Sequence, residues 1–195
     1  MRRNPSRRIS LMVNVSNAKV IDAKKNYIIP GGIDTHTHMQ LPFMGTVAVD
    51  DFNIGSRAAL AGGTTCFLDF VIPDKGESLL KAYDRWRGWA DPKVNCDYSL
   101  HCAVTSWNED VKKEMAEIVN RGVSSFKVFL AYKGALMLND SEFLKVLERC
   151  KELGAVCMVH AENGDLLYEA QKKMVELGIT GPEAHYLSRP ESFEA

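Results

Sequence analysis

Two histidines and a nearby aspartate give this sequence the residue types of a metal site. His36 and His38 are separated by one residue and follow a short apolar stretch at residues 26–30. On extended backbone, side chains two residues apart point to the same side, so both imidazoles can reach one cation. Asp34 shares that side and can support the pair by hydrogen bonding. Taken alone, such a pair fits a metal site and two solvent-facing loop histidines about equally well.

A lysine in an apolar run is the second chemical signal. Lys127 lies within Ser125–Leu130, although lysine is among the residues least often fully buried. Loss of its hydration is costly unless the amine is neutralised, paired or modified. One interpretation is a side chain that bends to solvent or pairs with Asp69 or Glu162. The interpretation we favour is a carbamate, formed with carbon dioxide, whose oxygens bridge two cations in a divalent-metal hydrolase.

His160 and Tyr132 are expected at the same place. His160 ends the apolar run of residues 155–159, and functional side chains of parallel barrels gather at the carboxyl ends of strands. Two cations about 3.5–4 Å apart can share a hydroxide and polarise a carbonyl. Imidazoles with a carboxylate-like oxygen suit zinc, with manganese as an alternative. Tyr132 follows the strand of Lys127, where its hydroxyl fits either an oxyanion donor or a packed loop tyrosine.

Predicted strands alternate with predicted helices along the chain. We expect strands at 26–30, 64–72, 98–105, 123–132 and 155–160, and helices at 51–61, 77–90, 109–120, 140–153 and 164–177. This alternation indicates parallel βα units, in either a doubly wound sheet or a (β/α)8 TIM barrel. A full barrel needs about 250 residues, so we predict an α/β chain with about the first five βα units of a barrel.

Composition limits the partners and the compartment. The chain has 195 residues, a net charge of −1 and 46% hydrophobic residues, which suits one domain with a real core. We expect no nucleic acid and no membrane partner. The five cysteines form no C-x-x-C pair, which favours reduced thiols and a cytoplasmic location. We assign residues 1–25 to a basic segment with a remnant of a small β-sandwich, and 26–195 to the barrel; a transit-like leader is the alternative for the start.

Six motifs, in order, resemble the dihydropyrimidinases and hydantoinases, a family of cyclic amidohydrolases within the urease-like metal-dependent hydrolases. The resemblance runs from about Val20 to the end of the chain. The motifs are Gly31–Gln40, Gly62–Thr65 with Asp69–Phe70, Trp89–Lys93, Ser125–Lys127, Ala131–Lys133 and His160–Asp165.

The resemblance implies a binuclear zinc site. The two first-strand histidines of the family fall on His36 and His38, and its next histidine ligand falls on His160. Its carboxylated lysine, an N6-carboxylysine that bridges the two Zn²⁺ ions of each subunit, falls on Lys127. Its oxyanion-stabilising tyrosine falls on Tyr132. The family also implies a homotetramer.

The substrate implied by the resemblance is a small cyclic amide. Substrate-gate residues of the family match Met39, Leu41 and Phe129, together with Tyr132. The stretch from Met39 to Met44 is apolar and has no arginine, which suits an uncharged ring better than a carboxylate. We expect hydrolytic opening of 5,6-dihydrouracil or dihydrothymine to an N-carbamoyl-β-amino acid, as in pyrimidine degradation.

The departures from the family define the alternatives. The family has a further histidine ligand and a metal-binding aspartate that carries protons, and neither matches a residue up to Ala195. We therefore expect the chain alone to be inactive. Collapsin-response-mediator proteins are a non-catalytic alternative, and they have lost metal ligands. Hydantoinases and allantoinases act on other rings, and the arginine expected of a dihydroorotase is missing from residues 40–44.

Overall fold

The computed structural model describes residues 21–194 and divides the chain into two units, Met1–Pro30 and Gly31–Ala195. The described part of the first unit contains no helix or strand. The arginines of the predicted basic segment lie outside the described residues, as does most of the predicted β-sandwich remnant. The division at residue 25 stays a prediction.

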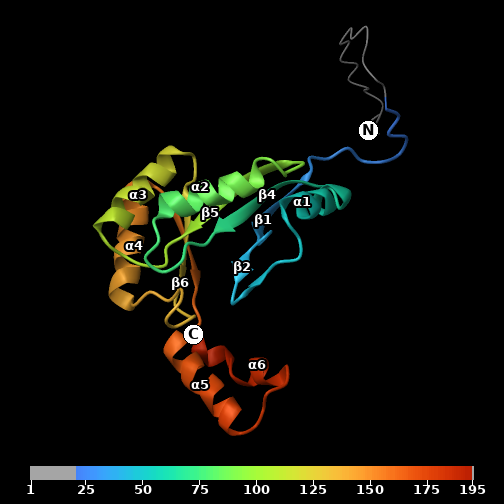
Figure 1. Cartoon of the computed structure of the whole chain (residues 1–195). Helices are drawn as coiled ribbons and strands as arrows, with labels where there is room; N and C mark the ends of the chain where they lie inside the picture. Colours follow the sequence, from blue (N-terminus) through green and yellow to red (C-terminus); the bar gives the residue numbers. More distant parts are fainter. Residues whose placement is uncertain (1–20, 195) are drawn as a thin grey trace, which may run out of the picture. The chain divides into compact units, whose positions relative to one another are not determined.

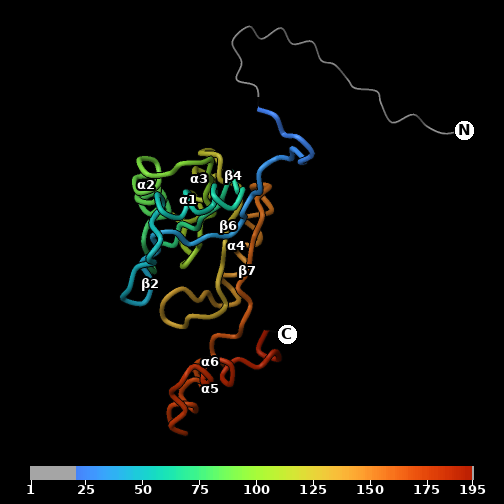
Figure 2. Tube along the Cα trace, turned by 90° about the vertical axis from the view of Figure 1, so that its right-hand side faces the viewer, coloured from blue at the N-terminus to red at the C-terminus, as the bar shows by residue number. Residues whose placement is uncertain are grey.

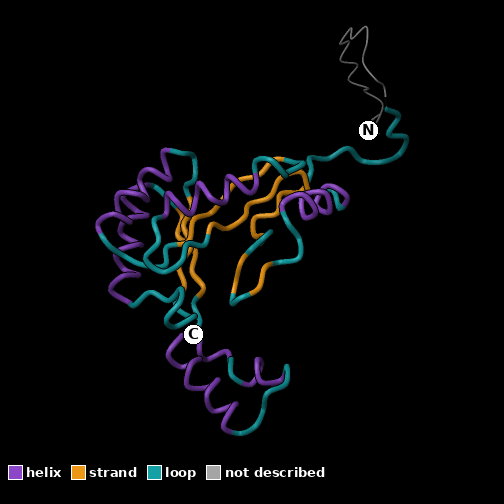
Figure 3. The backbone as a smooth tube through the Cα atoms, viewed as in Figure 1, coloured by secondary structure: helices purple, strands orange, loops and turns teal. Residues whose placement is uncertain are grey.

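A curled sheet of five parallel strands organises the second unit (Figure 3). Its order is β1-β4-β5-β6-β7, so each large strand lies beside the next one along the chain. The strands are β1 (Gly32–Thr37), β4 (Thr64–Val71), β5 (Asp97–Ala103), β6 (Ser125–Phe129) and β7 (Val156–His160). A doubly wound sheet reverses its strand order and carries helices on both faces. The continuous order confirms the first part of a (β/α)8 barrel.

Four helices connect these strands and pack against one face of the sheet (Figure 1). They are α1 (Phe52–Ala61), α2 (Leu79–Ala90), α3 (Glu109–Asn120) and α4 (Asp140–Leu153). One hydrophobic core contains side chains from all four helices and from the strands. Figure 2 shows β6 and β7 side by side with α4 beside them. Helix α5 (Gly164–Glu176), the short helix α6 (Glu183–Leu187) and the 3-10 turn Glu191–Phe193 follow β7.

The alternation of side chains along β6 shows how the sheet separates packing from chemistry. Phe126 and Val128 are completely buried in the core under the helices. Burial of each such side chain stabilises the fold by about 1.5–3 kcal/mol. Lys127 and Phe129 alternate with them and therefore point to the opposite, inner face. Lys127 therefore lies on the face of the sheet that these helices do not cover.

The helix boundaries agree with the sequence because polar caps fix them. Asn139 accepts a hydrogen bond from the Glu142 N–H, and the Glu142 side chain accepts one from Asn139 in return. This reciprocal cap supplies partners for orphan donors of the first turn. The same helix ends at Gly154, whose φ of 64° is left-handed.

The first strand differs from the prediction. Residues 26–30 form no strand and are exposed, and the ladder begins where the Gly32 N–H donates to the Gly63 carbonyl, 2.9 Å away. Pro30 has no N–H to give to a ladder. The prediction of a strand at 26–30 was therefore wrong. The first strand is β1, which lies further along the chain and contains His36.

A small hairpin after β1 was not predicted. Strands β2 (Pro42–Phe43) and β3 (Thr46–Val47) pair antiparallel around Met44 and Gly45. Both turn residues have positive φ, 51° and 82°, as a tight hairpin turn of the primed type requires. Methionine is not a residue that signals such a turn, so the hairpin could not be predicted from the local sequence.

No helix in the part of the chain from 21 to 194 is long and apolar enough to cross a membrane.

We predict that Gly164→Ala destabilises the fold. The Gly164 N–H donates to the Leu130 carbonyl, and an added Cβ would lie 2.7 Å from that same oxygen. The main chain would have to shift, at a cost of about 1–3 kcal/mol. Gly88 is the control, because a Cβ there meets nothing within 4 Å and the residue lies inside helix α2. Gly88→Ala should raise the free energy of unfolding by about 0.5–1 kcal/mol. Urea unfolding of both variants tests this, and equal midpoints would contradict it.

Candidate active site

The ring nitrogens of His36 and His38 lie close together on the inner face of the sheet. His36 belongs to β1, and His38 follows its last residue directly. The Nε2 atoms of His36 and His38 are 3.2 Å apart. The Phe70 ring lies under both, with centroids 4.4 and 5.0 Å from theirs. The His36 backbone N–H donates to Asp34 Oδ1 at 3.1 Å, so Asp34 lies beside the pair as expected. Both residues remain open to solvent, although contact with Phe70 removes part of the water around their rings.

The separation of the two nitrogens fits joint binding of a cation. Zinc–imidazole bonds are about 2.0–2.1 Å long. Nitrogens 3.2 Å apart therefore subtend about 100° at a shared ion, close to a tetrahedral angle. Among residues 21–194, no three His, Cys, Asp or Glu side chains form a metal-binding group.

The electrostatics of the pair favour the neutral imidazole, which is the form that binds metals. Burial and then the charge of Lys127 lower the pKa of His36 below its usual 6.5, although Asp34 opposes this. Burial, His36 and Lys127, in that order, lower the pKa of His38. The positive charge of Lys127 thus contributes to the lowering at both imidazoles.

Lys127 itself is half-buried on the inner face of β6. Its Nζ lies 5.6 Å from the centre of the Phe129 ring, and it makes no ion pair within the described chain. Burial lowers the pKa of the amine, while the Cys157 thiol opposes the change. The two carboxylates that the sequence offered as partners, Asp69 and Glu162, are bonded to other groups.

Asp69 is the most buried charged group of the site, with 0% of its surface exposed. Its Oδ2 accepts hydrogen bonds from the Thr37 hydroxyl at 2.8 Å and from the Met39 N–H at 2.7 Å. Its Oδ1 accepts the Phe70 N–H at 2.8 Å. Burial raises the pKa of this carboxyl to about 6, and the three hydrogen bonds oppose the rise. Sequence reasoning gave Asp69 no role of its own, although a charge in an apolar strand is the signal that singled out Lys127.

His160 lies at the end of β7, opposite Phe129 in register. Its Nε2 is 2.6 Å from Glu162 Oε2, and Arg189 Nε is 3.4 Å from the other oxygen of Glu162. The His160 ring is 5.4 Å from that of Tyr132 between centroids. The structure therefore brings His160 to Tyr132. Between residues 21 and 194, no contact joins His160 to the histidine pair.

His101 is held by hydrogen bonds within the protein. One ring nitrogen is hydrogen-bonded to the Ser125 hydroxyl, and the other lies 3.0 Å from the Thr35 carbonyl. Both nitrogens have partners, so His101 braces the inner face.

An apolar cavity of about 240 Å³ opens between His38 and Tyr132. Three of the four predicted substrate-contacting residues line it, and the set is His38, Leu41, Phe43, Ile72, Phe129, Tyr132 and Leu136. Met39 does not. Only 8% of Met39 is exposed, and its sulfur lies 2.6 Å from the position of a Cβ on Gly55. Its place in the core gives no support to a gate role.

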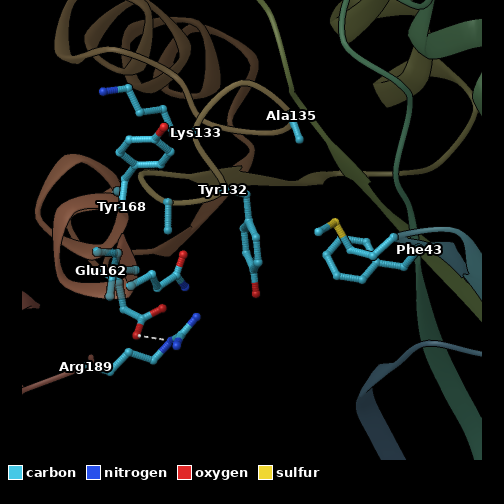
Figure 4. A pocket seen from close by; sticks show the side chains of 12 residues that line it. Phe43, Tyr132, Lys133, Ala135, Glu162, Tyr168 and Arg189 are labelled. Atoms are coloured by element: carbon cyan, nitrogen blue, oxygen red, sulfur yellow. Dashed lines mark ion pairs between the residues drawn. The ribbon is translucent and has the colours of Figure 1, made fainter. Parts of the chain in front are cut away.

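Tyr132 stands between this cavity and a second one of about 240 Å³ (Figure 4). Figure 4 shows its hydroxyl pointing into the open space, with Phe43 on one side and Tyr168 and Lys133 on the other. Tyr132 has a positive φ of 61°, and its carbonyl accepts the N–H groups of three residues that follow it. The turn therefore fixes the direction of the Tyr132 Cα–Cβ bond.

Known proteins are similar to this chain over nearly all of its length. The profile of the Amidohydrolase family matches residues 27–194. The dihydropyrimidinase of Dictyostelium discoideum is 64% identical over 91% of this chain and 35% of its own length. Human dihydropyrimidinase-related protein 5 is 54% identical over 91% of this chain and 32% of its own. The chain thus spans about a third of the length of these relatives.

Solved structures agree with the sequence relatives. The crystal structure of dihydropyrimidinase from Brevibacillus agri superposes with a TM-score of 0.90 at 45% identity, over 93% of this chain and 40% of that one. The D-hydantoinase from Bacillus sp. AR9 gives a TM-score of 0.91 at 43% identity, over 94% and 40%. The chain therefore belongs to the amidohydrolase family, and within that family to the group of dihydropyrimidinases and hydantoinases.

Proposed function

We propose that this chain supplies the first part of the active site of a zinc-dependent dihydropyrimidinase. The observation that carries the proposal is the juxtaposition of His36 and His38, with Nε2 atoms 3.2 Å apart. The half-buried Lys127 supports it, because its charge helps to lower the pKa of both imidazoles. An apolar cavity that contains the Tyr132 ring begins at His38. The proposed whole protein is a cytoplasmic homotetramer that acts on a small cyclic amide.

His36 and His38 would hold a cation, and Lys127 would hold two as a bridging carbamate. The neutral amine of Lys127 adds to carbon dioxide and releases one proton, which leaves an anionic group with two oxygens. The lowered pKa of this lysine raises the fraction of neutral amine, which is the reactive form. When bound, zinc ions lower the pKa of water and polarise a carbonyl oxygen.

His160 is the fourth proposed ligand, and Glu162 sets which nitrogen it would use. Because Glu162 Oε2 lies 2.6 Å from Nε2, Nδ1 is the nitrogen left for a cation. A carboxylate on the second nitrogen fixes the tautomer and the ring direction of a ligating histidine. The further ligands that the family resemblance implies match no residue of this chain.

The proposed reaction opens the ring of 5,6-dihydrouracil or 5,6-dihydrothymine. A water oxygen adds to the ring amide carbonyl, the carbon–nitrogen bond breaks, and the departing nitrogen takes a proton. The product is an N-carbamoyl-β-amino acid. The Tyr132 hydroxyl donates a hydrogen bond to the oxyanion that forms on the carbonyl. Leu41 and Phe129 form apolar walls around an uncharged ring, and a hydantoin ring is the alternative substrate.

A non-catalytic binding protein is the second candidate, favoured by the 54% identity to human dihydropyrimidinase-related protein 5. In this chain all four proposed ligand positions carry residues able to bind a metal or its carbamate bridge. That retention supports the enzyme, and the metal content decides between the two.

We predict that Lys127→Met raises the titration midpoints of His36 and His38. The Lys127 charge lowers the pKa of both imidazoles, so its removal should move the midpoints toward 6.5 in metal-free buffer without carbon dioxide. NMR titration of the ring resonances measures this. In ¹³C-labelled bicarbonate with zinc, the unchanged chain should show a carbamate carbon that Lys127→Met lacks. Unmoved midpoints would mean that the lysine does not face the pair.

We predict that zinc content separates the two candidate functions. A chimera that joins this chain to the remaining part of the Dictyostelium dihydropyrimidinase should bind two zinc ions per chain, as binuclear hydrolases do. His38→Asn should lose at least one of them. His185→Asn, at an exposed position on α6, should keep both. A metal-free chimera that binds a cytoskeletal protein would favour the binding protein.

We predict that Tyr132→Phe lowers kcat of this chimera on 5,6-dihydrouracil by about 10²–10³-fold, with KM nearly unchanged, because one oxyanion donor is lost. Tyr168→Phe, on the far wall of the second cavity, should leave both constants unchanged. The 195-residue chain alone should show no turnover. Turnover by that chain would overturn its proposed dependence on further ligands, and equal kcat values in the two variants would remove the role of Tyr132.

A further inference from the structure

The segment that follows β1 is held at two points. The Met39 N–H donates to Asp69 Oδ2 at 2.7 Å. The Met39 side chain lies in a slot beside Gly55, where a Cβ would come within 2.9 Å of three of its atoms. Directly after it, Gln40 takes a positive φ of 55°, which turns the chain toward the β2–β3 hairpin. His38 is therefore the last residue before a fixed corner.

One carboxylate oxygen binds both neighbours of His38. Asp69 Oδ2 accepts from the Thr37 hydroxyl at 2.8 Å and from the Met39 N–H at 2.7 Å. Anchoring the residues on either side of His38 limits its backbone dihedrals and hence the direction of its Cα–Cβ bond. Asp69 itself belongs to β4, next to β1 in the sheet, so a neighbouring strand sets that direction.

The Asp69 carboxylate is completely buried, and its hydrogen bonds all come from residues around the histidine pair. It is 0% exposed and forms no ion pair within residues 21–194. A buried carboxylate is costly unless hydrogen bonds replace its hydration. All three of its donors come from Thr37, Met39 and its own neighbour Phe70, and the Phe70 ring packs against both imidazoles. Every hydrogen bond of Asp69 thus ends on a residue next to, or in contact with, the histidine pair.

We propose that Asp69 is a positioning residue that presets the geometry of His36 and His38 for a cation by clamping the residues on both sides of His38. This inference rests on the proposed function in one respect, the use of the pair as metal ligands. The clamp itself is a property of the metal-free chain and is measured without metal.

The test compares Asp69→Asn with three other variants of the 195-residue chain. Asparagine keeps the size of the side chain but replaces one acceptor oxygen by an NH₂ group, so at least one of the three hydrogen bonds is lost. Ile118→Ala is the control for general destabilisation, because Ile118 is fully buried in α3, away from the site. Thr37→Val removes the hydroxyl alone, and Thr37→Ser restores it.

The metal-free readout is hydrogen exchange of the Met39 amide. We expect Asp69→Asn to speed this exchange at least tenfold relative to Ile118→Ala at matched stability, with a shift of the His38 ring resonances. Thr37→Val should shift the His38 ring resonances without fast Met39 exchange, and Thr37→Ser should reverse that shift. Equal Met39 exchange and unchanged His38 resonances in Asp69→Asn and Ile118→Ala would overturn the clamp.

The second readout is zinc affinity, measured by competition with a chromophoric chelator. Asp69→Asn should weaken zinc binding by about tenfold or more, as loss of a supporting group does in metal sites, and Ile118→Ala should leave it unchanged. Unaltered affinity with fast Met39 exchange would overturn the role in presetting the ligands. If the unchanged chain binds no zinc, the same variants are compared in the chimera, and a chimera without zinc would overturn the proposed function. The metal-free readout decides separately whether the clamp exists.

Discussion

Alternation along parallel strands is the constraint on which the rest of this structure depends. Each strand must give every second side chain to the core under the helices, so only the remaining side chains are free for chemistry. On β6 this rule buries Phe126 and Val128 and turns Lys127 inward. On β1 it turns His36 to the same inner face. Because adjacent strands are parallel and in sequence order, residues far apart in the sequence meet there without any special loop.

A charged residue within an apolar strand has two different structural outcomes in this chain, shown by Lys127 and Asp69. Lys127 lies on the inner face, is half-buried and makes no ion pair within the described chain. Asp69 follows the alternation of Phe67 and Val71, which belong to the helix-covered core, and three donors satisfy it. A charge without partners on an open face points to a ligand or a modification. A charge whose hydrogen bonds are all used points to a supporting role.

The sequence predicted the elements well wherever local chemistry sets their limits. Helix α4 begins at its cap Asn139 and ends at Gly154, since both positions carry residues suited to those conformations. Prediction from the sequence failed where contacts with residues far along the chain determine the structure. The start of β1 depends on a ladder bond to Gly63, and the place of Met39 depends on the absence of a side chain on Gly55. Neither effect leaves a trace in the local pattern.

The site was predictable in its residue types and less so in its connections. The spacing of His36 and His38 placed both imidazoles on one side, and the structure brings their nitrogens to 3.2 Å. The engagement of His160 with Glu162 needed coordinates, because a residue two positions away reaches back only when the chain turns after β7.

The left-handed backbone of Tyr132 has a consequence for how this site can change through evolution. A φ of 61° is costly for a residue with a Cβ, by about 1–2 kcal/mol, and three main-chain donors on its carbonyl keep it in place. The direction of the Tyr132 Cα–Cβ bond is thus set by main-chain hydrogen bonds, which side-chain substitutions nearby do not remove. Drift at wall positions such as Leu41 and Leu136 can therefore reshape the space for a ring substituent while the Tyr132 Cα–Cβ bond keeps its direction.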